Sequence, residues 1–355
     1  MREDIDDIRK RIEKIDNEIL RMMANRTAAA VEMGKRKASD SLPLRAPDVE
    51  EKVIGRYVNK AKEFGMSENS AATIARLLIH ESIEQQGLIP RPAKSKRMLI
   101  IGGNGKMGQW LCKFFASRGH KIKIYDTTEN TKYPCEKDLK QGVLEAEVVI
   151  ITVPISITAK MLEEVLSYSP SALIFDVSSV KTPSAAILKK GAKTAEVCSV
   201  HPMFGPETNS IIDENVVICN CGSYSAVDKA EELFDGANIT KTELDEHDKL
   251  MAYVLGLSHA TNIAFFETLN RSGKSYSELS RVASTTFKDQ VETSHNVVSD
   301  NAQLYYEIQN LNPYEQEVLS TLVDSVNTIK DAANKCNKEA FTKMMNEGKE
   351  YFGGN

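Results

Sequence analysis

The sequence has no excess of positive charge. Its 45 Lys and Arg residues are outnumbered by 50 Asp and Glu residues, which gives a formal net charge of −5 at pH 7. Binding to a nucleic-acid backbone normally depends on a clustered surplus of Lys and Arg. We therefore expect no nucleic-acid partner.

Long apolar runs are absent as well. No stretch approaches the roughly 20 apolar residues that a membrane-spanning helix needs. The N-terminus opens with alternating charges and lacks the basic and then apolar segments of a secretory signal. We expect a cytoplasmic protein that has no contact with a membrane.

Cysteine is sparse, with six residues scattered along 355 positions, which suits reduced thiols better than a disulfide framework. Cys219 and Cys221 lie in an apolar, strand-like run, where buried thiols are more common than a metal site. We predict no bound metal. The 41% hydrophobic and 27% charged residues are typical of a globular protein, and the length suggests two or three domains.

Residues 1–89 have a helical pattern. Apolar residues spaced alternately by three and four form a heptad seam that suits a partner helix. They are Ile5, Ile8, Ile12, Ile15, Ile19 and Met22. Pro43 and Pro47 interrupt the pattern, and Gly65 with Ser67 marks a third helix. We predict an all-helical bundle of three unequal helices.

The period changes after a short polar linker, residues 90–97, which begins Pro90-Arg91-Pro92. From 98 to 245, short apolar runs alternate with helical or turn segments, which is typical of a doubly wound α/β domain. The runs are Met98–Ile101, Ile122–Tyr125, Val148–Val153, Leu173–Val177, Val197–Val200 and Val216–Cys219. From 246 to 355 helix-like stretches dominate, such as Lys249–Leu269 and Tyr314–Cys336. We predict an all-helical third domain there.

A glycine-rich segment follows the first predicted strand directly and leads into a helical stretch, while the next predicted strand ends at Asp126. The glycines let the backbone approach a pyrophosphate at the helix N-terminus, and the acid can accept hydrogen bonds from the adenosine ribose. An acid here favours NAD over NADP by charge repulsion. The predicted NAD contacts are Gly103, Asn104, Gly105, Lys106, Met107, Gly108 and Asp126.

Two later strand ends carry polar residues, Ser178–Lys181 and His201–Glu207. In a doubly wound sheet both should face the nicotinamide crevice. Imidazole titrates near neutral pH, so His201 could accept a hydroxyl proton as a hydride leaves for the cofactor, and Ser179 could orient it. The other histidines rank below His201; they are His80, His120 and His295, which lack this context, and His247 and His259, which suit core or surface positions.

These segments resemble the prephenate dehydrogenase family. The likeness rests on Gly102–Gly108, Thr152–Pro154, Asp176–Lys181 and His201–Pro206, and it extends through Glu246–Asp248 to Gln303–Tyr305. The resemblance implies an NAD-dependent oxidative decarboxylation with His201 as catalytic base and Ser179 holding the ring hydroxyl. It adds Val153 and Pro154 to the expected cofactor contacts, and it implies that the third domain mediates dimerisation.

The first region resembles the all-helical chorismate mutases over nearly its whole length. The matching positions are Ile8-Arg9, Arg26, Gly34–Lys37, Glu50 and Ser82–Gln86. By resemblance Arg9, Arg26 and Lys37 grip the carboxylates and ether oxygen of chorismate, Glu50 binds the ring hydroxyl, Gln86 reaches the ether oxygen from the other side, and Ser82 belongs to the same set. Ala46 and Val49 stand where relatives have polar residues, which implies fewer contacts there.

The chemistry supports this assignment independently. The rearrangement of chorismate is unimolecular, so a catalyst needs only a cationic cage that fixes the compact conformer and stabilises charge on the breaking ether. Arg26 and Lys37, eleven residues apart, share one helix face about 16 Å apart along the axis. Arg26 also lies on the apolar face of the helix, between Met22 and Met33. A charge on that face would be partly buried and would need an anionic partner.

Arg9 and Arg26 are separated by seventeen residues, about 25 Å of helix and a rotation of about 100°. One helix cannot aim both into a pocket the size of chorismate. An antiparallel partner helix along the heptad seam would bring its own Arg9 beside this Arg26. We therefore predict a homodimer with shared mutase pockets.

One position departs from the prephenate dehydrogenase pattern. The family has a carboxylate-binding arginine in a Phe-Arg-Asp setting, where this chain has Phe287-Lys288-Asp289. Lysine keeps the charge but loses the two-pronged guanidinium geometry. We predict that Lys288, His259 and Glu207 bind the substrate. Arogenate is an alternative substrate, but the attached mutase favours prephenate.

The favoured function is therefore the conversion of chorismate to prephenate and then, with NAD, to 4-hydroxyphenylpyruvate in tyrosine biosynthesis. An arogenate or hydroxy-acid dehydrogenase with a helical appendage is an alternative, but it leaves the N-terminal cations unexplained. A non-catalytic NAD sensor with a helical dimerisation module is another, and it predicts no turnover of chorismate.

Overall fold

A computed structural model describes residues 4–40, 42, 45–87, 89, 95–129 and 132–353. Its contacts divide the chain into two compact units: unit 1 is Met1–Val153, Lys160–Val177 and Leu188–Thr242, and unit 2 is Pro154–Ala159, Ser178–Ile187 and Glu243–Asn355. Two segments that we assigned to the α/β domain from the sequence, 154–159 and 178–187, thus belong to unit 2 by their contacts. Most of the predicted linker, residues 90–94, lies outside the described residues, as does Pro43.

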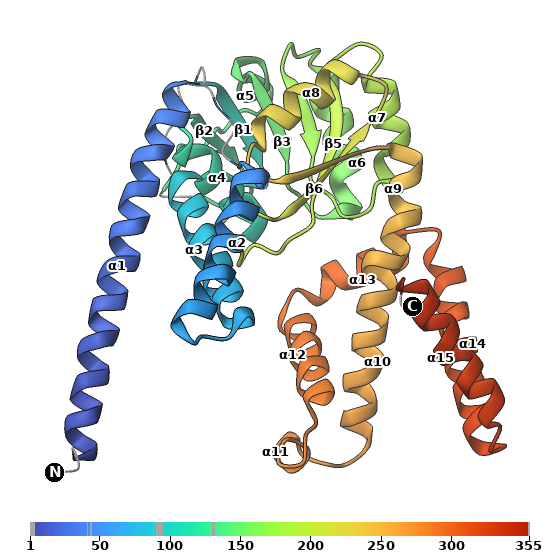
Figure 1. The fold of residues 1–355 in the computed structure, drawn as a ribbon. Helices are drawn as coiled ribbons and strands as arrows, with labels where there is room; N and C mark the ends of the chain where they lie inside the picture. Colours follow the sequence, from blue (N-terminus) through green and yellow to red (C-terminus); the bar gives the residue numbers. More distant parts are fainter. Residues whose placement is uncertain are drawn as a thin grey trace. The chain divides into compact units, whose positions relative to one another are not determined.

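Three helices open unit 1 (Figure 1): α1 (Ile5–Ser39), α2 (Pro47–Phe64) and α3 (Glu68–Gly87). Pro47 lies in the first turn of α2, where its missing N–H has no helical partner to lose. Gly65 ends the helix at φ 69°, a left-handed conformation that glycine adopts without strain. α3 packs against both α1 and α2.

The apolar seam of α1 faces solvent in the single chain. Ile12, Ile15 and Ile19 are 51%, 48% and 46% exposed. Fully burying a side chain of this size is worth about 1.5–3 kcal/mol. The seam therefore favours a partner helix, as its heptad spacing indicates.

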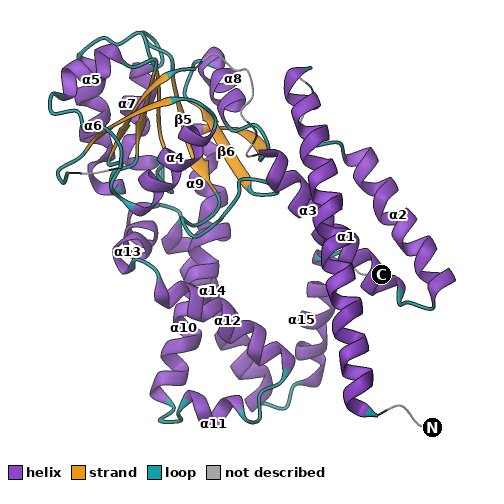
Figure 2. Cartoon of the chain, turned by 90° about the vertical axis from the view of Figure 1, so that its left-hand side faces the viewer, coloured by secondary structure: helices purple, strands orange, loops and turns teal. Residues whose placement is uncertain are grey.

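The rest of unit 1 is built on a seven-stranded sheet in the order β2-β1-β3-β4-β5-β6-β7, drawn in orange in Figure 2. The strands are β1 (Arg97–Ile101), β2 (Lys121–Tyr125), β3 (Val148–Ile151), β4 (Leu173–Asp176), β5 (Val197–Pro202), β6 (Asn215–Asn220) and β7 (Asn238–Glu243). Strands β1 to β5 run parallel, and β6 is antiparallel to β5. The chain leaves β1 for β2 on one side and returns to β3 on the other, which is the switch point where such sheets bind nucleotides.

Helices cover both faces of this sheet. The helices between strands are α4 (Lys106–Ser117), α5 (Leu139–Glu145), α6 (Ile155–Ser167), α7 (Ala185–Gly191) and α8 (Tyr224–Leu233). Met98, Ile100 and Phe175 point to one face and pack in a common core with α4 and α8. Leu99 points to the other face, where it meets α5 at Gly142.

The edge strand β7 was not predicted from the sequence. Its residues, Asn-Ile-Thr-Lys-Thr-Glu, are exposed or half-buried, so they lack the apolar run that marks the central strands. The central strands are visible in the sequence because parallel strands covered on both faces are apolar at nearly every position.

Unit 2 is helical, apart from its loops. Its helices are α9 (Leu244–Met251), a π-helical segment (Ala252–Leu257), α10 (Ser258–Arg271), α11 (Tyr276–Ser280), α12 (Thr285–Ser299), α13 (Ala302–Leu311), α14 (Glu315–Asn334) and α15 (Lys338–Tyr351). The single helix predicted over Lys249–Leu269 is thus interrupted by the π-helical segment. In the described part of the chain, no helix is both long and apolar enough to cross a bilayer. The predicted order of an all-α, a doubly wound α/β and an all-α region is confirmed.

Candidate active sites

The loop between β1 and α4 fits a dinucleotide. A Cβ added at Gly108 would lie 2.4 Å from the Gly102 carbonyl oxygen, so only glycine lets the loop fold back onto the start of α4. Gly102 itself has φ 81°, and its amide donates to the Tyr125 carbonyl at 2.8 Å. The N-cap of α4 is Gly105, which has no side chain, and the N-terminus of a helix is a favourable position for an anion.

Asp126 organises the rim of this loop. One carboxylate oxygen accepts the Asn104 amide at 2.9 Å, and the other accepts the Thr128 amide at 3.1 Å. The Asn104 side chain donates to the Thr128 carbonyl. Asp126 is half-buried and retains exposed surface for the ribose hydroxyls that the sequence assigns to it. The residues present therefore fit NAD, with Gly102–Gly108 at the pyrophosphate and Asp126 at the ribose.

His201 lies near the end of β5 and is only 3% exposed. Two residues earlier on the same face of the strand, buried Ser199 donates to Asp176 Oδ1 on β4 at 2.6 Å. This buried pair fixes the strands next to His201. Thr152 and Val153 follow directly after β3. The Thr152 hydroxyl donates to the Ile101 carbonyl, and Thr152 faces the glycine loop. From the sequence, Thr152 belonged to the segment that resembles the family but had no role assigned to it.

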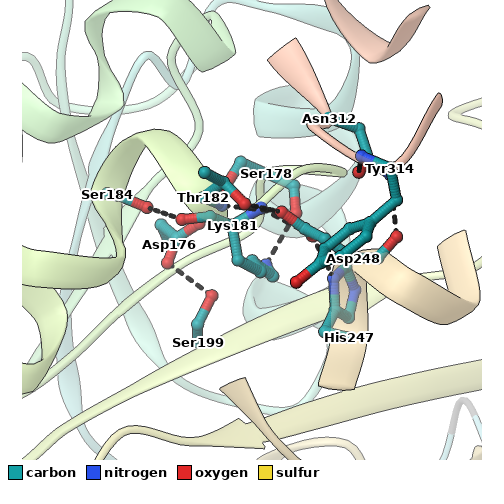
Figure 3. Close-up of polar contacts among 10 residues, drawn as sticks. All are labelled: Asp176, Ser178, Lys181, Thr182, Ser184, Ser199, His247, Asp248, Asn312 and Tyr314. Carbon is teal, nitrogen blue, oxygen red and sulfur yellow. Dashed lines mark hydrogen bonds and ion pairs between the residues drawn. The ribbon is translucent and has the colours of Figure 1, made fainter. Parts of the chain in front are cut away.

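Ser179 lies in a loop of unit 2 that one carboxylate clamps (Figure 3). The Asp248 carboxylate accepts the Lys181 amide at 2.9 Å and 3.0 Å, and the amide and hydroxyl of Thr182 at 2.7 Å each. His247 Nδ1 lies 2.7 Å from the same carboxylate. Pro154, the last predicted cofactor contact, also belongs to unit 2.

The charge on Asp248 is held in place by these donors. Burial opposes ionisation, but the bonds from His247, Lys181 and Thr182 hold the pKa of Asp248 below its usual range. His247 is completely buried, so of the core and surface positions that the sequence left open, it occupies a core position. From the sequence, Asp248 appeared only in the segment Glu246–Asp248 that resembles the family, because its partners lie 66 and 67 residues away in the chain.

Arg26 of the mutase region is anchored to α3. Its guanidinium donates to the Leu78 carbonyl at 2.6 Å and to the Ser82 hydroxyl at 2.5 Å. Gln86 lies one turn further along α3 and touches Gly34 of α1, where an added Cβ would be 2.6 Å from its side chain. Gln86 is 7% exposed, and its side-chain oxygen has no hydrogen-bond partner among the described residues.

Glu50 of α2 is held by Arg45 and by the Ala46 amide. Arg45 donates to both carboxylate oxygens, at 2.7 Å and 3.4 Å, and the Ala46 amide donates at 3.2 Å. Burial opposes the charge, but these bonds and the nearby charge of Lys37 hold the pKa of Glu50 below its usual range. The structure thus brings Arg26, Ser82 and Gln86 together, and Lys37 close to Glu50.

Arg9 does not belong to this group within one chain. Its side chain is 75% exposed and pairs with Asp6 one turn away on the same helix. Arg45, which binds Glu50, was missed from the sequence because no motif marks it.

The three predicted substrate contacts of the dehydrogenase lie on separate elements. Lys288 on α12 and Glu207 after β5 are exposed. His259 on α10 is half-buried, its ring lies 4.4 Å from that of Tyr305, and burial lowers its pKa to about 4. His259 Nδ1 has no hydrogen-bond partner among the described residues.

Comparisons with known families agree with this arrangement. The chorismate mutase type II model matches residues 8–87. The prephenate dehydrogenase nucleotide-binding domain matches residues 120–241, and the prephenate dehydrogenase dimerization domain matches residues 243–347.

Relatives match the same regions. The T-protein of Haemophilus influenzae is 25% identical over 362 residues, which cover 99% of this chain and 93% of that protein. A probable arogenate/prephenate dehydrogenase of Methanocaldococcus jannaschii is 25% identical over 269 residues, or 72% of this chain; the chain spans only 60% of that protein's length.

A solved structure shares the fold of the last two regions. It is the prephenate dehydrogenase of A. aeolicus in complex with hydroxyphenyl propionate and NAD+, with a TM-score of 0.59, 17% identity and coverage of 74% of this chain and 99% of that one. The chain therefore belongs to the family of bifunctional chorismate mutase/prephenate dehydrogenases of tyrosine biosynthesis, and it carries both activities, with NAD as the cofactor of the second.

Proposed function

We propose that Arg26, Lys37, Glu50, Ser82 and Gln86 form one mutase pocket, completed by Arg9 of the partner subunit in a homodimer. The observation that carries this proposal is the bond from Arg26 to Ser82, which holds the guanidinium on the face of α3 where Gln86 is buried one turn further along. The exposed seam of α1 supplies the surface for the partner helix.

In this pocket the protein acts as a fixed cage. Arg26 is held by two hydrogen bonds and therefore needs little reorganisation when the substrate arrives. Arg26, Lys37 and the partner's Arg9 bind the carboxylates and the ether oxygen, on which negative charge grows as the C–O bond breaks. Glu50 accepts the ring hydroxyl, and Gln86 donates to the ether oxygen.

We propose that His201 is the general base of the dehydrogenase. The β1–α4 loop and Asp126 would hold NAD, which would supply the hydride acceptor for this oxidation. His201 takes the hydroxyl proton, and the ring carboxylate leaves as carbon dioxide. By the family resemblance, Ser179 is proposed to bind the ring hydroxyl. Asp248 keeps the Ser179 loop rigid through its bonds to Lys181 and Thr182.

We propose prephenate, and not arogenate, as the substrate of this second site. The mutase on the same chain releases prephenate. The two compounds differ in the side chain, where prephenate has a keto group and arogenate an ammonium group. Lys288, placed at the side-chain carboxylate, would repel that ammonium group. His259 and Glu207 are proposed as further contacts.

We expect kcat/KM to be at least roughly tenfold higher with prephenate than with arogenate, and Lys288→Gln to lower the prephenate value by about 10- to 100-fold, as for a lost bond to a charged group. Steady-state kinetics with both substrates would measure this. Lys343→Gln removes the same charge from exposed α15 and serves as the control. Equal or better use of arogenate would contradict the proposal.

A further inference from the structure

Within unit 1, the mutase helices pack against the loop that joins β5 to β6. Ile79 and Ile83 of α3 share a hydrophobic core with Trp110 of α4 and with Ile211 and Ile212 of that loop. The Trp110 indole nitrogen donates to the Thr208 carbonyl at 2.6 Å, which holds the start of the loop.

Asp213 follows this apolar contact and points toward the mutase helices. It has φ 66°, a left-handed conformation uncommon for residues other than glycine but tolerated by Asp and Asn. Strand β7 fixes its backbone, because the Asn238 side chain donates to the Asp213 carbonyl at 3.0 Å and the Asn238 amide donates to the Glu214 carbonyl at 2.8 Å.

Two mutase side chains meet the Asp213 carboxylate. Arg45 Nη1 donates to Oδ1, and His80 Nδ1 of α3 lies 3.5 Å from Oδ2. The other two nitrogens of the same guanidinium bind Glu50. The planar guanidinium of Arg45 is therefore fixed between two carboxylates, one from each domain. Because the guanidinium is rigid, the position of Asp213 affects the orientation of Glu50.

We propose that Asp213, a residue of the nucleotide-binding domain, is a positioning residue for the mutase reaction and acts through Arg45 on Glu50. The inference rests on the proposed role of Glu50 in binding the ring hydroxyl. Asp213 anchors the far end of the guanidinium, and the near end holds the Glu50 carboxylate in the orientation that the hydroxyl meets. The mutase site is therefore complete only when the dehydrogenase part of the chain is folded beside it.

Asp213→Asn in the full-length chain tests this, because asparagine keeps the shape and tolerates the positive φ while removing the charge. We expect mutase kcat to fall roughly three- to tenfold, as for a weakened charge-assisted bond, with a smaller change in KM for chorismate. NAD-dependent oxidation of prephenate should not change. Asp228→Asn, which removes an exposed carboxylate from α8 on the same domain, should change neither activity.

The pH profile of the mutase separates positioning from a merely structural role. The groups that face Glu50 and Asp213 are Lys37 of α1, Arg45 before α2 and His80 of α3, with Glu214 beside Asp213. If Arg45 loosens, Glu50 loses part of the interaction that favours its charged form. The acid limb of mutase kcat/KM should then move to higher pH in Asp213→Asn, and not in Asp228→Asn.

Three further variants complete the test. Arg45→Lys keeps the positive charge but loses the planar guanidinium, so it should reproduce the mutase defect. In an Arg45→Met background, Asp213→Asn should lower mutase activity no further. Glu50→Gln tests the underlying role: full mutase activity in that variant would refute the part given to Glu50. A defective Glu50→Gln beside a fully active Asp213→Asn would overturn only the positioning role, as would an equal loss of both activities in Asp213→Asn.

Discussion

His201→Asn should remove most hydride transfer while leaving NAD binding and mutase activity intact. A general base typically contributes about 100- to 10,000-fold to the rate, and asparagine cannot accept the hydroxyl proton. His201 is buried near the end of β5, beyond the Ser199–Asp176 pair, whereas the glycine loop that holds NAD belongs to β1 and α4. The loss should therefore appear in kcat for prephenate oxidation, with an unchanged Kd for NAD.

The matched control is His295→Asn, which changes an exposed histidine on α12 and should leave both activities near wild type. Prephenate oxidation by His201→Asn at a near-normal rate and with an unaltered pH profile would refute the role of His201. His259 would then be the next candidate, although its lowered pKa, about 4, leaves it a weak base at neutral pH.

Arg9→Ala and Arg26→Ala should each be almost inactive as mutases, yet a mixture of the two should recover activity. In the shared-pocket model each pocket takes Arg26 from one chain and Arg9 from its partner. Unfolding and refolding the two variants together gives about half mixed dimers, and half of the pockets in a mixed dimer contain both arginines. About a quarter of wild-type mutase activity should therefore return.

Each variant refolded alone controls for activity gained by the procedure itself. Mass spectrometry under native conditions should confirm that mixed dimers have formed. Mixed dimers without recovered activity would exclude the shared pocket and leave Arg9 with only a structural role.

The domain order could be predicted from the sequence because hydrophobic periodicity reports local structure. The seam from Ile5 to Met22 has helical spacing, and the runs from Met98 onward are apolar at nearly every position, as buried parallel strands are. Strand β7 was not predicted, because Asn238–Glu243 form an edge strand that is largely exposed and therefore lacks an apolar run. The π-helical interruption at Ala252–Leu257 has no periodic signature that separates it from a continuous helix.

Site residues were predictable where a motif carries them and were missed where distant segments meet. The glycine loop and Asp126 are linked by a spacing that any dinucleotide fold requires. The bonds from Asp248 to Lys181 and Thr182, and the contact between Arg45 and Asp213, join residues 66 to 168 positions apart. Such pairings cannot be recognised in a single sequence, because each of these charged residues, taken alone, looks like an ordinary surface charge.

The central claim is that one chain carries both reactions, and it is tested most directly by giving the purified full-length protein chorismate with and without NAD. Without NAD, prephenate should accumulate and the reaction should stop there. With NAD, NADH and 4-hydroxyphenylpyruvate should form in equal amounts as prephenate is consumed. A folded protein that yields neither prephenate nor NADH would contradict the account.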